Sequence, residues 1–446
     1  MELKSNKRLS VFSLVMINVI AICSLRSLPF SATFGWYLIP IYLIAAIGFL
    51  MPIAAISSFF ASRFPVRGGL YVWVREALGL KFGFLAIWLQ WVYNVLWYPT
   101  AMVFVVETLL YGLNIQVSRI DLIEITTILF WLITIANCFG MKISSWISII
   151  GAMLGTFIPI ILLIFLATIW VHSGNHIAIT GSNDWHGSLP LLVTIIFGLM
   201  GIEMSCVHAN DVNNPKKSYP KALFLSCAII VTILAFSSLA IATIVPHETL
   251  NVLNGANQAF SIVLEYSKLS YLKPIVMGLI ALGGLACIGA WVIGPSKGLF
   301  VASSDKCLPS YFNTTNKHEV PQRLLITQAL LVTVLNIFYL YMPSVEQAYE
   351  IMSIATSQLA ILTYLILLYA GYKFHTTNMP GYEVPGGRKV FKKLCCSGFI
   401  ISLTVLIIGF QPPASIKATT YKYDLWLIFW MIVLIAPAFA LTKGKK

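Results

Sequence analysis

Apolar runs long enough to cross a membrane recur along the whole 446-residue chain. A membrane-spanning helix needs about 20 consecutive apolar residues, and short polar loops separate runs of that length here. The most economical division gives twelve spans. Their approximate ranges are 10–33, 36–61, 82–112, 120–140, 146–171, 188–209, 221–246, 271–303, 322–342, 346–372, 396–413 and 425–442. The pattern predicts an all-α polytopic membrane protein that forms a single transmembrane domain over residues 1–446.

The segment between the second and third spans is too short and too polar to cross the bilayer. It contains Trp73, Arg75 and Glu76, which suit a short helix in the plane of the membrane interface. No loop is long enough to form a separate soluble domain.

Composition excludes several other classes of protein. Hydrophobic residues make up 59% of the chain, charged residues make up 10%, and the mean hydropathy is +0.86. Soluble domains are about 45–50% apolar and about 25% charged. A soluble enzyme, a disordered chain and a disulfide scaffold are therefore excluded, and the continuous apolar runs exclude a porin-type barrel, whose strands alternate. The eight cysteines show no paired spacing, so we expect no metal site and no cofactor.

The net charge of +13 reflects topology and does not indicate a nucleic-acid partner. Of the 29 lysines and arginines, about 23 fall in loops on the N-terminal side of the membrane and about five in the opposite loops. Because basic loops stay in the cytoplasm, we expect both termini there. We therefore expect an integral membrane protein that is surrounded by lipid.

Two spans contain helix-breaking residues at mid-depth. In the first span, Cys23, Ser24 and Ser27 precede Pro29, which removes a backbone donor. In the sixth span, two glycines and Glu203 follow Phe197. Breaks in corresponding spans indicate the site of an inverted-repeat transporter, here with repeats over about 10–171 and 188–372 and two further spans over 396–442. The alternative is that both breaks are kinks that serve helix packing.

Charged residues inside the spans are few: Arg26, Glu107 and Glu203. A charge in the bilayer is costly, so each is a candidate functional residue. Arg26 could bind a substrate carboxylate, neutralise Glu203 across the two breaks, or extend to the interface. Glu107 lies toward the outer end of its span, where a solvated or lysine-paired role is equally open. His208 lies one turn beyond Glu203 and could tune its proton affinity.

Two further spans present polar or aromatic groups. Gln90, Asn94 and Trp97 or Tyr98 share one helical face of the third span, which suits a polar cavity or, alternatively, an aromatic belt with an interhelical hydrogen bond. In the eighth span, Trp291 is the one bulky ring in a run of small residues that permits close helix packing.

Several motifs in this order resemble those of the amino acid–polyamine–organocation (APC) transporters over essentially the whole chain. They are Arg63-Phe-Pro…Gly68-Gly69-Leu-Tyr71…Arg75-Glu-Ala-Leu-Gly79, Gly201-Ile-Glu203, Asn213-Asn-Pro215-Lys-Lys…Tyr219-Pro220-Lys-Ala222 and Trp291-Val-Ile-Gly294-Pro295-Ser296-Lys-Gly298. Three further stretches are most similar to the glutamate:γ-aminobutyrate antiporter branch. They are Val207-His208-Ala-Asn210-Asp211, Val384-Pro-Gly-Gly387 and Gly409-Phe-Gln-Pro-Pro413.

The resemblance implies a LeuT-type fold of two inverted five-span repeats, with spans 1 and 6 broken. It also implies a substrate site at the breaks. Backbone amides of Ile22, Cys23 and Ser24 would hold a carboxylate, and carbonyls near Phe197 and Met200 would hold an amine. The resemblance implies further substrate positions at Gln90, Asn94, Gly201, Trp291 and Tyr364. Arg26 is added to this set because it is a charged residue inside a span. Phe197 matches an aromatic gate, and Glu203, with His208 nearby, matches the carboxylate linked to gating and proton coupling.

The resemblance implies that the chain is a transporter and not an enzyme, working in a bacterial inner membrane, with an amino acid substrate and a homodimer as its candidate assembly. The expected activity is exchange of amino acids such as glutamate, or related amines such as γ-aminobutyrate, by alternating access. Span 5 lacks a lysine and span 8 lacks a serine or threonine around Ala286–Ala290, which favours exchange over ion symport. A proton-coupled symporter is the alternative, and a membrane sensor or membrane-embedded enzyme is the alternative of another class.

Overall fold

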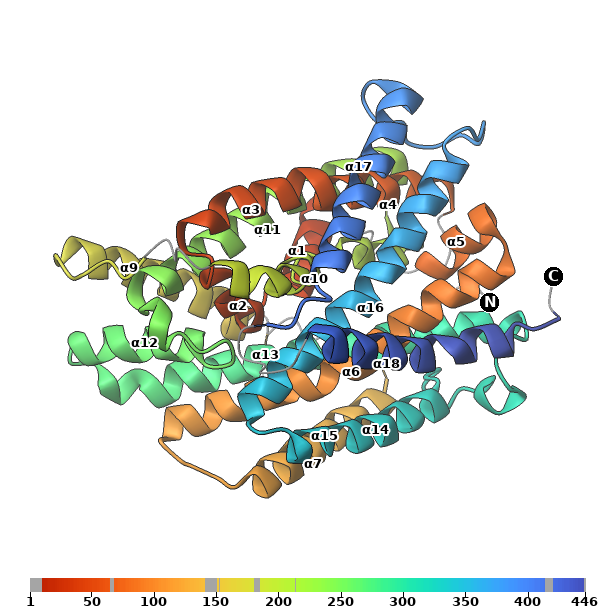
Figure 1. Ribbon diagram of the computed structural model, residues 1–446. Coiled ribbons are helices and arrows are strands. Elements are labelled where there is room, and N and C mark those ends of the chain that lie inside the picture. Colours follow the sequence, from red (N-terminus) through yellow and green to blue (C-terminus); the bar gives the residue numbers. More distant parts are fainter. Residues whose placement is uncertain are drawn as a thin grey trace.

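The computed structural model describes residues 10–64, 68–140, 151, 153–179, 185–212, 214–413 and 420–444. Within these ranges the chain is built from helices and contains no extended β-strand. The long helices pack side by side as one bundle (Figure 1). The all-α prediction is therefore confirmed.

The described part of the chain has twelve candidate membrane spans. Eleven helical segments of the described chain are long and apolar enough to span a membrane, and a pair of helices bent by 43° forms one more. The bent pair contains α1 (Val11–Ile22), η1 (Leu25–Ser27) and α2 (Leu28–Ala32). The other spans are formed, in chain order, by η2 (Gly35–Tyr37), α3 (Leu38–Ala45), η3 (Ala46–Leu50) and α4 (Met51–Arg63); α6 (Leu80–Leu113); α7 (Arg119–Cys138); η4 (Met153–Phe157) and α9 (Ile158–His172); η5 (Trp185–Leu191), α10 (Leu192–Phe197) and η6 (Ile202–Asp211); α11 (Pro215–Ile244); η8 (Ser270–Leu272) and α13 (Lys273–Ser304); α14 (Gln322–Asn336) and α15 (Phe338–Tyr341); α16 (Val345–Phe374); α17 (Gly387–Ile408); and α18 (Thr420–Leu441).

These spans correspond one to one with the twelve predicted runs. The largest difference is at the eleventh, where α17 begins at Gly387 and not near residue 396. Its first turns carry Arg388, Lys389, Lys392 and Lys393, so the helix extends beyond its apolar part. The start of the fifth predicted run lies in residues 141–150, outside the described ranges.

The first span breaks where its sequence predicted. Cys23 and Ser24 have extended backbone conformations between α1 and η1, and the Ser24 hydroxyl accepts a hydrogen bond from the Arg26 amide at 3.3 Å. Pro29 is at the second position of α2, where a missing amide proton costs no helical hydrogen bond. The break is thus capped by the same serine and proline that mark it in the sequence.

The sixth span breaks between α10 and η6. Gly201 has φ of +112°, a conformation that only glycine adopts readily, and it begins the 3₁₀ turn that starts at Ile202. A Cβ atom on Gly198 would lie 3.4 Å from the Ser27 side chain, so the two breaks lie against each other.

In the described part of the chain, two short α-helices lie between the spans, together with the 3₁₀ turns η7 (His247–Thr249) and η9 (Ser310–Phe312). α5 (Leu70–Leu78) confirms the predicted short helix, and its Trp73 is buried and stacks on Phe60 with ring centroids 5.8 Å apart. α12 (Gly255–Tyr266), between α11 and α13, was not predicted. Its polar residues interrupt the apolar pattern, and it packs against α9 and α11 instead of crossing the membrane.

Spans that would be equivalent in two five-span repeats pack directly on each other. These pairs are α1 with η6, α4 with α11, α6 with α13, and α7 with α14. The last two pairs run side by side in Figure 1. This pairing is compatible with the predicted inverted repeats, which stay a prediction.

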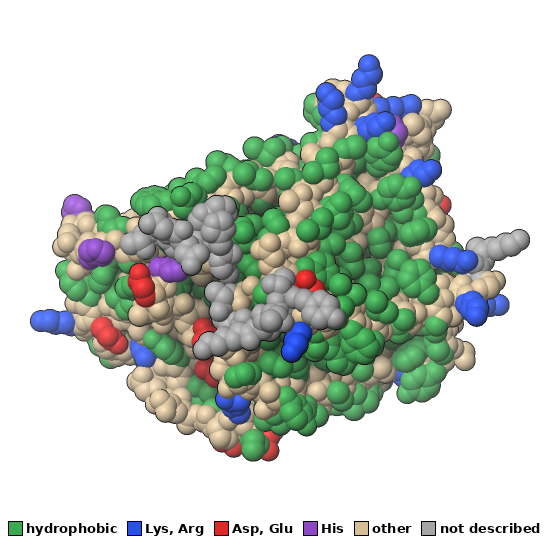
Figure 2. All heavy atoms as spheres, viewed as in Figure 1, with side chains coloured by type: hydrophobic (Ala, Val, Ile, Leu, Met, Phe, Trp, Pro, Cys, Tyr) green, Lys and Arg blue, Asp and Glu red, His purple; other side chains and the backbone are tan. Residues whose placement is uncertain are grey.

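The surface separates into an apolar middle and polar ends. Figure 2 shows hydrophobic side chains over the middle of the visible face, and a group of lysines and arginines at the end where α16 and α17 meet. That end carries Lys373, Arg388, Lys389, Lys392 and Lys393. Exposed side chains such as Ile128, Leu132 and Ile135 on α7 face outward, as expected for a lipid-facing helix.

Candidate functional site

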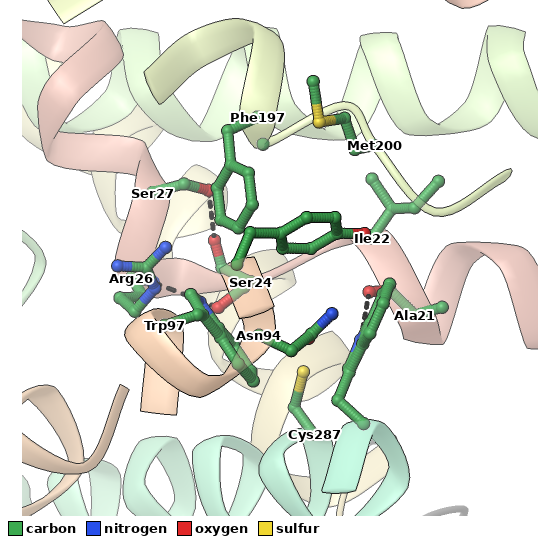
Figure 3. A pocket seen from close by; sticks show the side chains of 13 residues that line it. Ala21, Ile22, Ser24, Arg26, Ser27, Asn94, Trp97, Phe197, Met200 and Cys287 are labelled. Carbon is green, nitrogen blue, oxygen red and sulfur yellow. Dashed lines mark hydrogen bonds between the residues drawn. The ribbon is translucent and has the colours of Figure 1, made fainter. Parts of the chain in front are cut away.

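A cavity of about 50 Å³ lies between the two broken spans (Figure 3). That volume holds a few water molecules. The residues that line it are Ala21, Ile22, Ser24, Arg26, Ser27, Tyr93, Asn94, Trp97, Phe197, Gly198, Met200, Cys287 and Trp291. The cavity thus joins both breaks to the middle of α6 and α13.

Seven of the predicted substrate residues line this cavity. They are Ile22, Ser24, Arg26, Asn94, Phe197, Met200 and Trp291. Cys23, Gln90, Gly201 and Tyr364 are buried around it without lining it. The structure therefore brings the predicted residues together, and their role in binding stays a prediction.

Several lining residues were absent from the predicted set: Ala21, Ser27, Tyr93, Trp97, Gly198 and Cys287. Trp97 shares a helical face with Asn94, and Ser27 and Gly198 belong to the two breaks, so those signals were present. Cys287 lies one turn before Trp291 on α13. Cys287 lines the cavity because α13 packs against the first span, which the sequence pattern alone does not specify.

Arg26 is the one formally charged residue among those that line the cavity. Its side chain is 6% exposed, and its Nη1 atom donates to the Thr100 hydroxyl at 3.4 Å. The guanidinium carbon lies 5.8 Å from the Trp97 ring centroid, 6.0 Å from that of Phe197 and 5.9 Å from that of Tyr349. Such cation–π contacts stabilise a cation by about 0.5–2 kcal/mol each.

The structure bears on two of the three roles left open for Arg26, and binding of a substrate carboxylate stays a prediction. Burial excludes extension to the interface. Pairing with Glu203 is also wrong, because the ion pairs within 4.0 Å in the described part of the chain join only Arg75 to Glu76 and to Asp305. A charge at the bilayer centre costs about 2.5–3.5 kcal/mol on insertion scales, which the rings offset in part. The geometry therefore leaves the guanidinium available to an anionic ligand.

Glu203 is instead held by Tyr364 of α16. The Tyr364 hydroxyl donates to Glu203 Oε1 at 2.7 Å and accepts from the Gly201 amide at 2.9 Å. Glu203 is 5% exposed, and its Oε2 atom has no hydrogen-bond partner among the described residues. This network fixes the second break to α16. The side chain of His208 lies outside the described residues, so its influence on Glu203 stays a prediction.

Trp291 connects α13 to both breaks. Its indole Nε1 donates to the Ala21 carbonyl at 3.3 Å, which satisfies one of the carbonyls left free in the last turn of α1. Its own carbonyl accepts from the Tyr98 hydroxyl of α6 at 2.9 Å. A Cβ atom on Gly201 would lie only 3.0 Å from the Trp291 ring, so the glycine is also required by close packing.

The third span contributes one wall of the cavity. Tyr93 meets Phe197 edge to face with ring centroids 6.1 Å apart, which closes the space between α6 and α10. The Asn94 side chain donates back to the Gln90 carbonyl at 2.7 Å. The cavity is therefore bounded here by the aromatic rings of Tyr93 and Phe197 and by the side-chain amide of Asn94.

The described residues contain no group of three or more histidine, cysteine or acidic side chains placed to hold a metal ion. All eight cysteines are free thiols. The chemistry of the cavity thus consists of one cation, aromatic rings, small polar side chains and the backbone of two broken helices.

Known proteins resemble this chain along nearly its whole length. The model of the amino acid permease family matches residues 8–436. A protein of Legionella pneumophila named only as an uncharacterised transporter is 40% identical over 443 residues, which cover 97% of this chain and 96% of that protein. A glutamate/γ-aminobutyrate antiporter of Lactococcus lactis is 28% identical over 96% of this chain and 89% of its own.

A more distant relative is named for different substrates. The cadaverine/lysine antiporter of Escherichia coli is 23% identical over 78% of this chain and 76% of its own. The family match, the candidate spans and the two breaks all indicate a membrane transporter. The chain is an integral membrane transporter that belongs to the amino acid permease family.

Proposed function

We propose that the protein exchanges an acidic amino acid, glutamate in the first instance, for a related amine such as γ-aminobutyrate. It does so as a single domain of two inverted five-span repeats in a bacterial inner membrane. One observation carries the substrate assignment: a buried arginine that lacks an acidic partner in the described chain lines the cavity between the breaks.

The names of the relatives support the same substrate pair. The Lactococcus lactis relative is named for glutamate and γ-aminobutyrate, and the Escherichia coli relative for lysine and cadaverine. Each name pairs an amino acid with its decarboxylated product. The buried cation in this chain suits the first pair, because glutamate and γ-aminobutyrate both have a carboxylate and cadaverine has none.

In the proposed bound state, the substrate lies across the two breaks. The backbone amide of Ser24 at the first break receives one carboxylate. The Cys23 amide, which the sequence also suggested for this role, already donates to the Val19 carbonyl at 2.8 Å, and Ile22 lies inside α1. The guanidinium of Arg26 receives a carboxylate at the other end of the molecule. Carbonyls near Phe197 and Met200 receive the ammonium group. The Phe197 ring and Trp291 then cover the substrate from opposite sides.

Tyr364 provides a mechanical link for alternating access. It holds Gly201 and Glu203 of the second break against α16, so movement of that break must release or carry the tyrosine. In this proposal Glu203 and Tyr364 couple movement of the second break to α16.

Counterflow in proteoliposomes tests the proposal. Vesicles are preloaded with glutamate, with γ-aminobutyrate, with lysine or with buffer alone, and uptake of labelled glutamate is measured. We expect uptake with the first two interiors and none above background with the last two. Uptake that is equal in all four, or that follows an imposed proton gradient with buffer inside, would replace exchange with uniport or proton symport.

A further inference from the structure

The guanidinium of Arg26 has only neutral polar neighbours in the described structure. The hydroxyl of Thr100 accepts from it at 3.4 Å, and the Tyr349 hydroxyl lies beside it. Three aromatic rings complete its surroundings. In Figure 3 the group lies at one side of the cavity, beside Trp97 and away from Ile22 and Met200.

No carboxylate in the part of the chain that the structure describes lies within ion-pair distance of Arg26. The nearest candidate in the sixth span, Glu203, is engaged by Tyr364. Among the described residues the guanidinium therefore has no acidic partner within 4.0 Å, and it is buried away from bulk water. Its hydration depends on water in the cavity between the breaks.

Closure of the cavity has opposite consequences with and without a substrate. When the cavity is empty, closure removes water from an unpaired cation, which is strongly unfavourable in a low-dielectric interior. When a carboxylate is present, the guanidinium gains an opposite charge and a bidentate hydrogen-bond partner. Loaded and empty carriers therefore differ in their ability to pass through the occluded state.

We propose that Arg26 makes this transporter an obligatory exchanger, because its unpaired charge prevents the empty carrier from closing and returning. This inference rests on the proposed exchange function and names the residue that enforces it. The ligand that releases the block is any substrate with a carboxylate that reaches the guanidinium.

The test compares exchange with net efflux in the same proteoliposomes. Vesicles loaded with labelled glutamate or γ-aminobutyrate are diluted into buffer with or without unlabelled substrate. In the unmodified protein we expect exchange to exceed net efflux by at least about tenfold. In Arg26→Met we expect the ratio to fall to about one, because an apolar side chain lets the empty cavity close.

Two matched variants separate charge from shape and from burial. Arg26→Lys keeps the charge and loses the planar fork, so it should keep a high ratio while its KM for the carboxylate substrate rises. Arg63→Met removes another buried arginine, which donates to the Phe59 and Tyr382 carbonyls far from this cavity, and should keep the ratio of the unmodified protein. A ratio in Arg26→Met that stays high, or one that falls equally in Arg63→Met, overturns the inference.

The two proposals fail in distinguishable ways. If the unmodified protein itself shows equal exchange and net efflux, the exchange function is wrong. If it exchanges tightly and Arg26→Met does so too, only the role of Arg26 is wrong.

A second measurement tests the proposal even if Arg26→Met folds but does not transport. Cys287 lines the cavity, so its modification by N-ethylmaleimide, read by mass spectrometry of the peptide that contains it, reports whether the cavity is open. We expect glutamate to slow modification in the unmodified protein, and Arg26→Met to be modified slowly without any substrate. Modification of the empty variant at the rate of the empty unmodified protein contradicts the proposal.

Discussion

Gly201 shows how one residue supports both the backbone and the packing of the site. Its φ of +112° excludes most side chains, and an added Cβ atom would lie 3.0 Å from the Trp291 ring and 3.5 Å from the Ile22 side chain. Both neighbours belong to the cavity wall, so neither is free to move away without changing it.

We expect Gly201→Ala to destabilise the protein and to slow exchange. The strained backbone costs about 1–3 kcal/mol, and the displaced Trp291 ring narrows the cavity. Thermal unfolding in detergent should show a clear fall in Tm, and counterflow should fall with it.

Gly278→Ala is the matched control for this change. Gly278 lies in α13, the helix that contains Trp291, and an added Cβ atom there meets no atom within 4 Å. We expect Tm to stay the same or to rise slightly, since alanine stabilises a helix interior by about 0.5–1 kcal/mol relative to glycine. An equal loss of stability in both variants would show that Gly201 has no special role.

At the scale of elements, α5 is attached to the end of α13 by one acidic residue. Asp305, which follows α13, accepts hydrogen bonds from the Tyr71 hydroxyl and, at 2.7 Å, from Arg75 Nη1. Arg75 also pairs with Glu76 at 2.9 Å. The short helix α5 is thus linked to the span that carries Trp291.

The link predicts a pH dependence of stability. Burial opposes ionisation of Asp305, but hydrogen bonds from Tyr71 and Arg75 and the charge of Arg75 together hold its pKa below its usual value. A lowered pKa stabilises the fold above the unfolded value of about 3.9 and loses that effect as the pH falls through the folded value. Because the pair is one-third exposed, its contribution is about 0.2–1 kcal/mol.

We therefore expect Asp305→Asn to lower Tm modestly at pH 7, with the difference shrinking as the pH falls below about 4 and vanishing once the pH has passed the lowered pKa of Asp305. Glu76→Gln is the control, because Glu76 pairs only with Arg75 on the same helix and does not join α5 to α13. It should leave Tm almost unchanged at pH 7. A difference for Asp305→Asn that persists undiminished at low pH would exclude the ion pair as its cause.

Element by element, the sequence predicted what the bilayer itself demands. A spanning helix must be apolar for its whole length, so the twelve spans appear as continuous runs, and Pro29 and Gly201 mark the breaks because few residues substitute for them there. α12 was missed because it packs on other helices and not in lipid, so its pattern is that of an ordinary amphipathic segment.

The site was predicted less completely for a related reason. A residue's distance from another span is set by tertiary packing, so the sequence placed Arg26 and Glu203 as possible partners while the structure assigns Glu203 to Tyr364. Tyr93 and Cys287 entered the cavity wall through the packing of α6 and α13, which no local pattern specifies.

At the scale of the whole molecule, charge is distributed unevenly between the two ends. The loop between α16 and α17 and the first turns of α17 are basic. The opposite end carries His172 at the end of α9, Glu248 before α12 and Glu265 within α12. Lysine and arginine near the ends of spans favour the cytoplasmic side, so this asymmetry predicts an orientation.

We expect the α16–α17 loop to face the cytoplasm and the end of α9 to face outward. Two exposed positions report on this, Thr376→Cys in the loop and Ser173→Cys after α9, in a Cys396→Ser background that removes the exposed native thiol. A membrane-impermeant maleimide added to intact cells should label Ser173→Cys and leave Thr376→Cys unlabelled until the membrane is permeabilised. Both should label equally in detergent. Labelling of Thr376→Cys in intact cells would reverse the orientation, and the basic loops would then have crossed the membrane against the charge rule.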